Sequence, residues 1–318
     1  MPPLKQQQQR HSLDYGVRTN HPTSYDDNPS FKGPLVLQEA ASSNIHRRRI
    51  RGHYLNNKKL KEAVLDESDV YLPVQLSACA STATIIKSIV DHLARNDAPI
   101  DIKEVAESTE FYLRSGKRLF GAARRVLDNK PNTRESDNSS IITIHDLCSG
   151  HGLTGMLFVA CNPPRDKSRG EHIRTVLVDR SKPQSHEIVR NIISEVCPWV
   201  NENSVKFKSS SLEHYVPTAK AEHGTSIIIS THACGSLTDD VLNFSVEKEA
   251  AAVAVMPCCY TGTDAEVPYG LRRMLGVSLS ADVRRSFFMQ SKGYHVDFAT
   301  IPRAVSPMNR IIIAEQRK

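Results

Sequence analysis

A glycine-rich turn between a β-branched run and an apolar segment constrains the fold of this chain most strongly. Residues 141–147 read Ile-Ile-Thr-Ile-His-Asp-Leu, and Gly150, Gly152 and Gly155 follow around the start of an apolar stretch from Leu153 to Ala160. The pattern predicts a strand, a tight loop and a helix. Glycine allows a sharp turn and a close approach to a ligand, and a helix N-terminus offers free N–H donors. We therefore expect a nucleotide-like cofactor at this loop.

The length and hydropathy of the chain set the class of protein. Its 318 residues suffice for one large α/β domain and a smaller appendage. No apolar run approaches the roughly 20 residues that cross a bilayer, so we expect no membrane association through a spanning helix. The N-terminus lacks the apolar core of a signal peptide, which predicts an intracellular protein of the cytoplasm or nucleus.

Charge and cysteine content add weaker constraints. The net charge of +6 is compatible with a nucleic-acid partner but does not require one. The seven cysteines form no small-domain disulfide framework, and several lie in apolar strands or at strand ends. We expect them to be reduced thiols.

The first 139 residues differ in composition from the rest. Residues 1–45 are rich in Gln, Asn, Ser and Pro, which predicts a disordered tail, and residues 46–139 read as a helical N-terminal segment with a linker. The basic run His46–Arg51 is interpreted as a phosphate-binding or nuclear-targeting patch or, with greater weight, as a solvated entry to the first helix. Apolar spacing predicts helices over 76–93 and 102–127, and a polar linker follows over 129–140.

Residues 140–318 alternate between apolar strands and helical segments, which favours a parallel sheet covered on both faces. A short connection containing proline joins the last two strands, so they should run antiparallel to each other. A helix is expected over 282–291. Strands are predicted over 141–147, 174–179, 204–208, 225–230, 250–256, 294–301 and 310–314.

Polar and reactive side chains concentrate where these strands end. Ligands of doubly wound sheets bind at the carboxyl ends of the strands. Asp146 and the glycine loop follow the first strand, and Asp179, a carboxylate suited to two ribose hydroxyls, follows the second. Asp179 lies further from the loop than the roughly 20 residues typical of nicotinamide-binding domains, but an inserted loop explains such a gap.

The segment from Asp146 to Gly152 resembles the first motif of class I S-adenosylmethionine-dependent methyltransferases. The segments His232–Gly235 with Thr238-Asp239, and Pro257–Tyr260, are similar to a methyltransferase-domain subgroup. That subgroup includes the tRNA acceptor-stem 2′-O-methyltransferase and a glutathione S-transferase C-terminal-domain protein. The resemblance covers about residues 140–318. It implies a Rossmann-like α/β fold, a seven-stranded sheet with a terminal antiparallel hairpin, and S-adenosyl-L-methionine as cofactor.

The resemblance also implies where the cofactor binds. Cys148 stands where the family has its first glycine, so the turn must tolerate a side chain. Asp146 is expected to accept from the cofactor's amino group, to cap the loop amides, or both. The implied cofactor-binding residues are Asp146, Cys148, Gly150, His151, Gly152, Asp179, Ser211, Leu212, Thr231 and His232.

Three interpretations of the chemistry after the fourth and fifth strands remain open. His232 is a candidate general base, because an imidazole titrates near neutral pH, and Cys259 is a candidate nucleophile. Both side chains can equally pack around the sulfonium end of the cofactor. A zinc site is not predicted, because consecutive Cys258 and Cys259 in a strand-like backbone should point apart.

The favoured activity is methyl transfer from S-adenosylmethionine to an oxygen or nitrogen nucleophile, with RNA as the favoured acceptor. A small-molecule or protein methyltransferase shares every cofactor feature. A non-catalytic binding or scaffold relative and, least favoured, a nicotinamide oxidoreductase also remain. The sequence does not predict an oligomeric state.

Overall fold

The computed structural model describes residues 80–129, 141–164, 171–217, 224–260, 267–302, 305–306 and 308–317. The predictions for the N-terminal tail, the basic run, the start of the first helix and the linker before residue 141 lie outside these residues.

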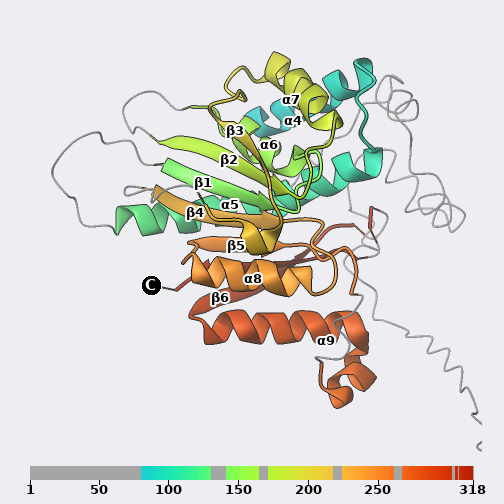
Figure 1. Cartoon of the computed structure of the whole chain (residues 1–318), viewed down its shortest axis with the longest axis vertical. Coiled ribbons are helices and arrows are strands. Elements are labelled where there is room, and N and C mark those ends of the chain that lie inside the picture. Colours follow the sequence, from blue (N-terminus) through green and yellow to red (C-terminus); the bar gives the residue numbers. More distant parts are fainter. Residues whose placement is uncertain are drawn as a thin grey trace, which may run out of the picture. The chain divides into compact units, whose positions relative to one another are not determined.

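A seven-stranded mixed sheet organises the chain (Figure 1), and its strand order is β3-β2-β1-β4-β5-β7-β6. Strands β1 to β5 pair in parallel, and β7 runs antiparallel to both β5 and β6. The predicted fold class, including the terminal antiparallel hairpin, is confirmed. The strands are β1 (Ile141–Leu147), β2 (His172–Asp179), β3 (Val205–Ser209), β4 (Gly224–Ser230), β5 (Ala252–Val255), β6 (Tyr294–Thr300) and β7 (Arg310–Gln316).

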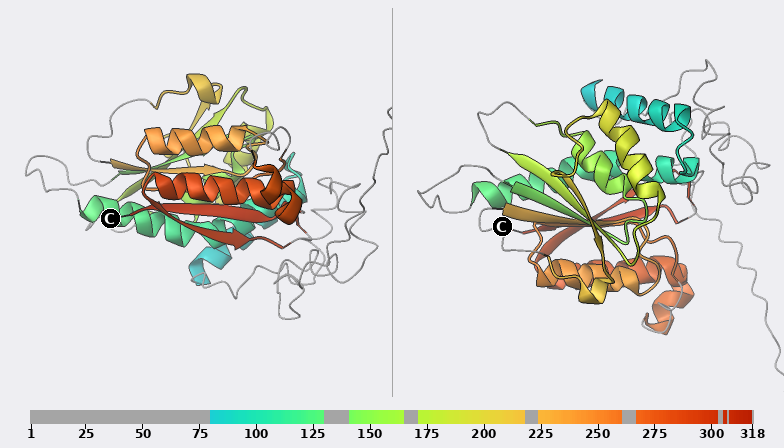
Figure 2. Two further views of the ribbon diagram at one scale, coloured as in Figure 1. Left: turned by 90° about the horizontal axis from the view of Figure 1, so that it is seen from below. Right: turned by 45° about the horizontal axis from the view of Figure 1, so that its top comes forward.

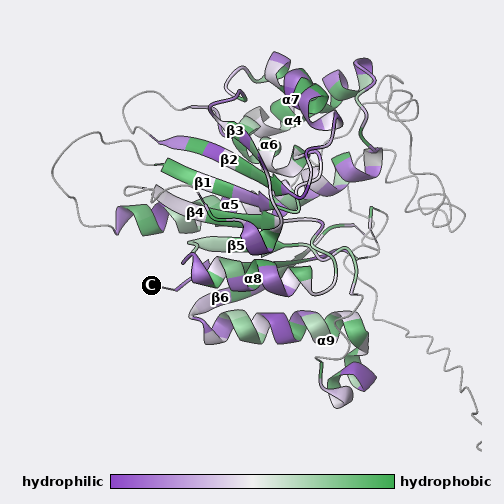
Figure 3. Cartoon of the chain, in the orientation of Figure 1, coloured by the Kyte–Doolittle hydropathy of each residue, from purple (hydrophilic) through white to green (hydrophobic). Residues whose placement is uncertain are grey.

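Helices cover both faces of the sheet (Figure 2). Strand alternation explains why two apolar layers form: Ile227 and Ile229 of β4 belong to one buried cluster, whereas Ile228 belongs to the other. Figure 3 shows the apolar character of the central strands. One face carries α4 (Ala80–Arg95), α5 (Ile102–Asp128), α6 (Leu153–Ala160) and α7 (Ser185–Val196), and the other carries α8 (Leu237–Glu247) and α9 (Tyr269–Ser291).

Helix α9 is longer than the predicted segment 282–291. It begins at Tyr269 and contains a kink at Gly276, whose φ is +74°. The part before the kink carries exposed apolar side chains, including Met274 at 81% exposure. Apolar periodicity marks a buried helix face, so it located the half of α9 that packs and missed the half that does not.

Most basic side chains of α5 form ion pairs within the protein. Arg118 lies 2.7 Å from Glu315, and Arg124 makes two hydrogen bonds to Glu171. Glu315 also pairs with Arg125 at 2.6 Å. These contacts fasten α5 to β7 and to the residue before β2.

The strand order reverses between β1 and β4, with β2 on the other side of β1. The loops that follow these three parallel strands therefore emerge at one edge of the sheet, where ligands bind in open α/β folds. None of the helices in the described part of the chain has the length and apolar character that a membrane span requires.

Candidate functional site

The loop after β1 is a tight turn built on left-handed backbone. Gly150 has a φ of +53° and Gly152 a φ of +85°, and the Gly152 N–H donates to the Ser149 carbonyl at 2.8 Å. A Cβ at Gly155 would lie 2.6 Å from Leu177 Cδ2, so α6 approaches β2 as closely as glycine permits. Each glycine of the motif thus has a steric reason of its own.

Cys148 opens this turn in the same left-handed region, with a φ of +58°. The expectation that the turn tolerates a side chain at this position is therefore met. A non-glycine residue in this region costs roughly 1–2 kcal/mol. Burial raises the pKa of the Cys148 thiol to about 11, so the thiol stays protonated at neutral pH and is a poor nucleophile.

We expect Cys148→Gly to be more stable than Cys148→Ala by about 1 kcal/mol. Both variants remove the same sulfur, and only alanine keeps the backbone penalty. Urea unfolding of the two variants measures the difference. Equal stability would show that the turn relaxes out of the left-handed region when the sulfur is removed.

Asp146 lies at the end of β1 and is buried, with 1% exposure. Its Oδ2 accepts a 2.9 Å hydrogen bond from the Gly155 N–H, whereas Oδ1 has no hydrogen-bond partner among the described residues. The nearby Ser149 hydroxyl is also buried and unpartnered there. Native proteins rarely leave buried polar atoms unpaired, so these two atoms fit a loop that completes its hydrogen bonds with a ligand.

Burial raises the pKa of Asp146 to about 7 from an ordinary 3.8. Between these values the unfolded chain binds fewer protons than the folded protein, so this carboxyl lowers stability as the pH rises. Asp146→Asn keeps an acceptor for Gly155 but cannot titrate. Between pH 5 and pH 7 we expect the free energy of unfolding to fall by roughly 2–3 kcal/mol less in this variant than in the wild type. Urea unfolding at several pH values tests this. Parallel curves would place the pKa near its ordinary value.

Asp179 ties the end of β2 to the glycine loop. Its Oδ2 accepts from the Gly150 N–H at 2.9 Å, and its Oδ1 accepts from the Arg180 N–H at 2.7 Å. The Ser210 N–H donates to the Asp179 carbonyl at 2.8 Å, which brings the end of β3 alongside. Each carboxylate oxygen can accept more than one hydrogen bond, so Asp179 retains capacity for ribose hydroxyls. Ser211 and Leu212 follow there, half-buried.

The start of α5 lies over the glycine loop. His151 Nε2 lies 3.2 Å from Glu104 Oε2, and the hydrogen bond with Glu104 raises the pKa of His151. On its other side the His151 ring bonds the Ser185 hydroxyl. The family resemblance implied His151 as a cofactor-binding residue, but nothing in the sequence pointed to Glu104. The two residues are far apart in the chain, and only the packing of α5 joins them.

Thr231 and His232 follow β4. A chain of hydroxyls joins α5, α6 and this loop, with Ser108 and Thr154 2.9 Å apart and Thr154 and Thr231 3.4 Å apart. His232 opens onto a cavity of about 340 Å³ together with four side chains of the α5 N-terminal region. These are Asp101, Lys103, Glu104 and Glu107. The cavity lining is therefore predominantly acidic.

The cysteines after β4 and β5 depart from the sequence-based expectation. Cys234 and Cys258 form a disulfide, so the expectation of reduced thiols is wrong for this pair. The sulfurs of Cys234, Cys258 and Cys259 all lie within 4.8 Å of one another, so the prediction that consecutive cysteines point apart is also wrong. Strand β5 ends at Val255, and without strand pairing the next residues need not alternate between faces.

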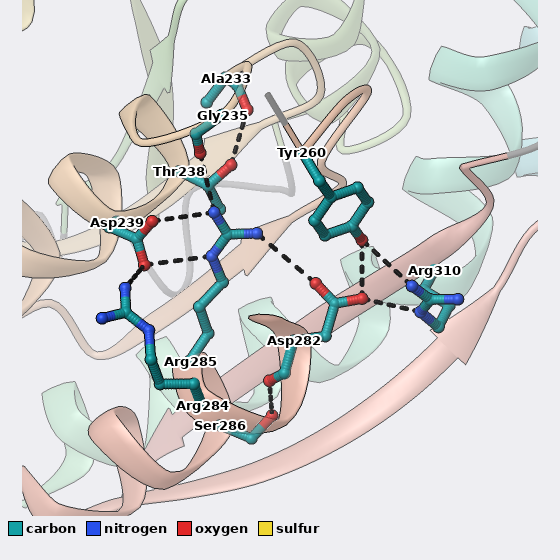
Figure 4. Close-up of polar contacts among 10 residues, drawn as sticks. All are labelled: Ala233, Gly235, Thr238, Asp239, Tyr260, Asp282, Arg284, Arg285, Ser286 and Arg310. Atoms are coloured by element: carbon teal, nitrogen blue, oxygen red, sulfur yellow. Dashed lines mark hydrogen bonds and ion pairs between the residues drawn. The ribbon is translucent and has the colours of Figure 1, made fainter. Parts of the chain in front are cut away.

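A buried ionic network supports these two loops from below (Figure 4). Arg285, with 1% exposure, donates to Asp239 at 2.9 Å and to the Gly235 carbonyl at 2.8 Å. The Tyr260 hydroxyl donates to Asp282 at 2.7 Å, and Arg310 donates to the same oxygen at 2.7 Å. Asp239 and Tyr260, from the motifs after β4 and β5, and Arg310, the first residue of β7, therefore share one support.

A family model and several solved structures resemble this chain. Residues 122–266 match the model of a family described as a methyltransferase domain. No curated protein matches the chain. Solved structures similar to this chain include three with low identity to it and TM-scores below 0.5.

The first is the fibrillarin pre-rRNA processing protein of Methanococcus jannaschii, with 7% identity, 57% of this chain and 67% of that chain covered, and a TM-score of 0.34. The second is the 23S rRNA methyltransferase ErmE, with 12% identity, 61% and 68% covered, and a TM-score of 0.33. The third is cofactor-bound Rv0187 from MTB, with 12% identity, 63% and 90% covered, and a TM-score of 0.35.

Proposed function

We propose that this protein is an S-adenosylmethionine-dependent methyltransferase that acts on an oxygen or nitrogen nucleophile. The observation that carries the proposal is the loop after β1, where left-handed glycines, the unpartnered Asp146 Oδ1 and the Asp179 carboxylate meet within a matched methyltransferase domain. Two buried polar atoms of this region, Asp146 Oδ1 and the Ser149 hydroxyl, have no hydrogen-bond partner among the described residues and are available to a ligand.

The residues fit the cofactor in a definite order along the strand ends. The backbone from Gly150 to Gly152 would hold the methionyl part, Asp179 the ribose hydroxyls, and Ser211 with Leu212 the adenine. When bound, S-adenosylmethionine supplies a methyl group on a sulfonium, which is already reactive toward nucleophiles. The chain then has to orient the acceptor, exclude water and accept a proton.

We propose that His232 is the general base that accepts the proton of the methyl acceptor. It lines the cavity beside the loop, it follows the buried Thr231, and its imidazole is suited to general-base catalysis at neutral pH. Cys259 remains a proposed second candidate on the acceptor side, in the loop after β5. His232→Ala should lower methyl transfer while leaving binding of S-adenosylhomocysteine within a few-fold of the wild type.

RNA is the acceptor class we propose first. The net charge of +6 supports it, as do Tyr269, with 71% exposure, and the exposed Arg273 at the start of α9. Aromatic faces and arginines are the side chains that stack on unpaired bases.

The acidic lining of the cavity beside His232 favours a second acceptor class. Asp101, Glu104 and Glu107 outnumber Lys103 there, which suits an acceptor that carries a protonated amine better than one that carries phosphates. A protein or small-molecule amine is therefore the alternative acceptor.

Two measurements test these proposals in sequence. Calorimetry with S-adenosylhomocysteine and with NAD identifies the cofactor class, and heat with NAD alone would overturn the proposal. Tritiated methyl transfer into fractionated cell extract then identifies the acceptor. Label that nuclease releases and that declines steeply with salt supports RNA, whereas label that protease releases, or that stays in the small-molecule fraction, supports the amine class.

A further inference from the structure

Three sulfurs gather at the rim of the candidate site, between the loops that follow β4 and β5. Cys234 is exposed and forms a disulfide with the half-buried Cys258. Cys259 carries a free, half-buried thiol, and its sulfur lies within 4.8 Å of both disulfide sulfurs. A backbone hydrogen bond from the Gly235 N–H to the Cys259 carbonyl, at 3.3 Å, holds the two loops side by side.

This arrangement has the two features that make a disulfide exchangeable. Exposed disulfides tend to be the labile ones, and the exposed Cys234 sulfur is open to attack by a small thiol. The third sulfur provides an internal thiol that can attack the pair. By contrast, burial raises the pKa of both Cys148 and Cys197 to about 11, so neither of those thiols is set up to react at neutral pH.

We propose that Cys234, Cys258 and Cys259 form a redox-active thiol site that exchanges with low-molecular-weight disulfides of the glutathione class. The Cys234 thiolate attacks the glutathione disulfide, whose S–S bond breaks to release one glutathione thiolate and leave a mixed disulfide. The Cys258 thiolate then attacks the Cys234 sulfur and expels the second glutathione thiolate. Two cysteine thiols are oxidised to a disulfide, and one glutathione disulfide is reduced to two thiols.

The ionic network keeps the site assembled in both states. Arg285 donates to the Gly235 carbonyl, next to Cys234, and its guanidinium carbon lies 5.5 Å from the Tyr260 ring centre, in the loop that carries Cys258 and Cys259. The two loops therefore stay close when the disulfide opens. A high effective concentration of one thiol around the other then allows the bond to form again.

The disulfide also connects the two loops that carry the candidate acceptor-side residues. His232 lies two positions before Cys234, and Cys259 follows Cys258 directly. Oxidation adds a covalent bond between the His232 loop and the Cys259 loop, and reduction leaves the two loops joined by non-covalent contacts alone. This consequence rests on the proposed function, whereas the thiol chemistry does not.

The test counts and locates thiols in the full chain equilibrated in glutathione buffers of graded ratio, without cofactor or acceptor. We expect seven thiols in reducing buffer and five in oxidising buffer, with the Cys234–Cys258 bond identified by alkylation and peptide mapping. Cys258→Ser should trap glutathione on Cys234 or divert the bond to Cys259. Cys259→Ser should keep the bond but slow its opening by glutathione severalfold. Cys161→Ala, which removes a buried thiol outside the site, should lower both counts by one and leave the midpoint unchanged.

Three results would overturn the proposal: seven thiols at every glutathione ratio, a disulfide that reductants reach only after unfolding, or a stoichiometric zinc ion that protects the three thiols. Binding of S-adenosylhomocysteine is measured separately on the oxidised and reduced protein. Absence of binding in both states would count against the proposed function and leave the thiol result standing.

Discussion

Replacing Arg285 with methionine lowers the free energy of unfolding by about 3–5 kcal/mol, because it removes a buried charge that lies between two carboxylates. Asp239 then relies on Arg284 and Asp282 on Arg310, and both of these arginines are partly exposed. The Arg285 guanidinium donates twice to Asp239, at 2.9 and 3.2 Å, and its Nη1 lies 3.6 Å from an oxygen of Asp282. The side chain of Asp282 is completely buried, and burial raises its pKa. Methionine replaces much of the arginine's volume but none of its charge.

Arg284 provides a matched control on the same carboxylate. It lies 2.8 Å from Asp239 Oδ1, but its side chain is 35% exposed. Arg284→Met should therefore cost less than about 1 kcal/mol. Urea unfolding of the two variants and the wild type gives the comparison, and a difference between the variants below 1 kcal/mol would show that water reaches the network.

A second substitution separates charge from packing. Asp239→Asn in the Arg285→Met background removes one of the two carboxylates that lost a partner and should recover part of the lost stability. No recovery would assign the loss to packing around the arginine. Recovery would show that the buried charges stabilise the protein only as pairs, because a buried carboxylate destabilises the fold when its arginine partner is removed.

The network also shows how far the sequence could predict this protein. The strands were predictable because continuous apolar runs such as Ile227–Ile229 have few alternatives in a buried parallel sheet, and the glycine loop because left-handed backbone selects glycine. Asp239 and Tyr260 were visible as motif residues, and Arg310 as the start of a predicted strand. The network that joins these residues was not predictable, because Arg285, which lies between them, belongs to no sequence motif.

The remaining differences have the same origin. The pairing of Cys234 with Cys258 depends on where β4 and β5 end relative to each other, and the contact of Glu104 with His151 depends on how α5 lies across the sheet. Neither is encoded in a periodicity of 2 or 3.6 residues, which reports only the face that a residue occupies. Both contacts depend on how elements distant in the sequence pack together, and so do the ion pairs of the basic side chains of α5.

Asp179→Ala should weaken binding of S-adenosylhomocysteine by at least about 100-fold. Two effects combine in this variant. The proposed hydrogen bonds of the carboxylate to the ribose are lost, and a hydrogen bond to a charged group contributes about 1.5–3 kcal/mol. The Gly150 N–H also loses its acceptor at 2.9 Å, so the loop that would hold the methionyl part is no longer fastened to β2. A loss of 2.7 kcal/mol corresponds to about 100-fold in affinity.

Asp179→Asn and Asp128→Ala provide the controls. Asparagine keeps one acceptor for Gly150 but lacks the charge, so its affinity should lie between those of the wild type and Asp179→Ala. Asp128 is exposed at the end of α5, and its removal should leave binding unchanged. Calorimetry gives the affinities, and thermal unfolding verifies that each variant is folded. An affinity of Asp179→Ala for S-adenosylhomocysteine within threefold of the wild type would show that Asp179 does not bind the ribose. The half-buried Ser211, where β3 ends beside the same loop, would then be the next candidate for that contact.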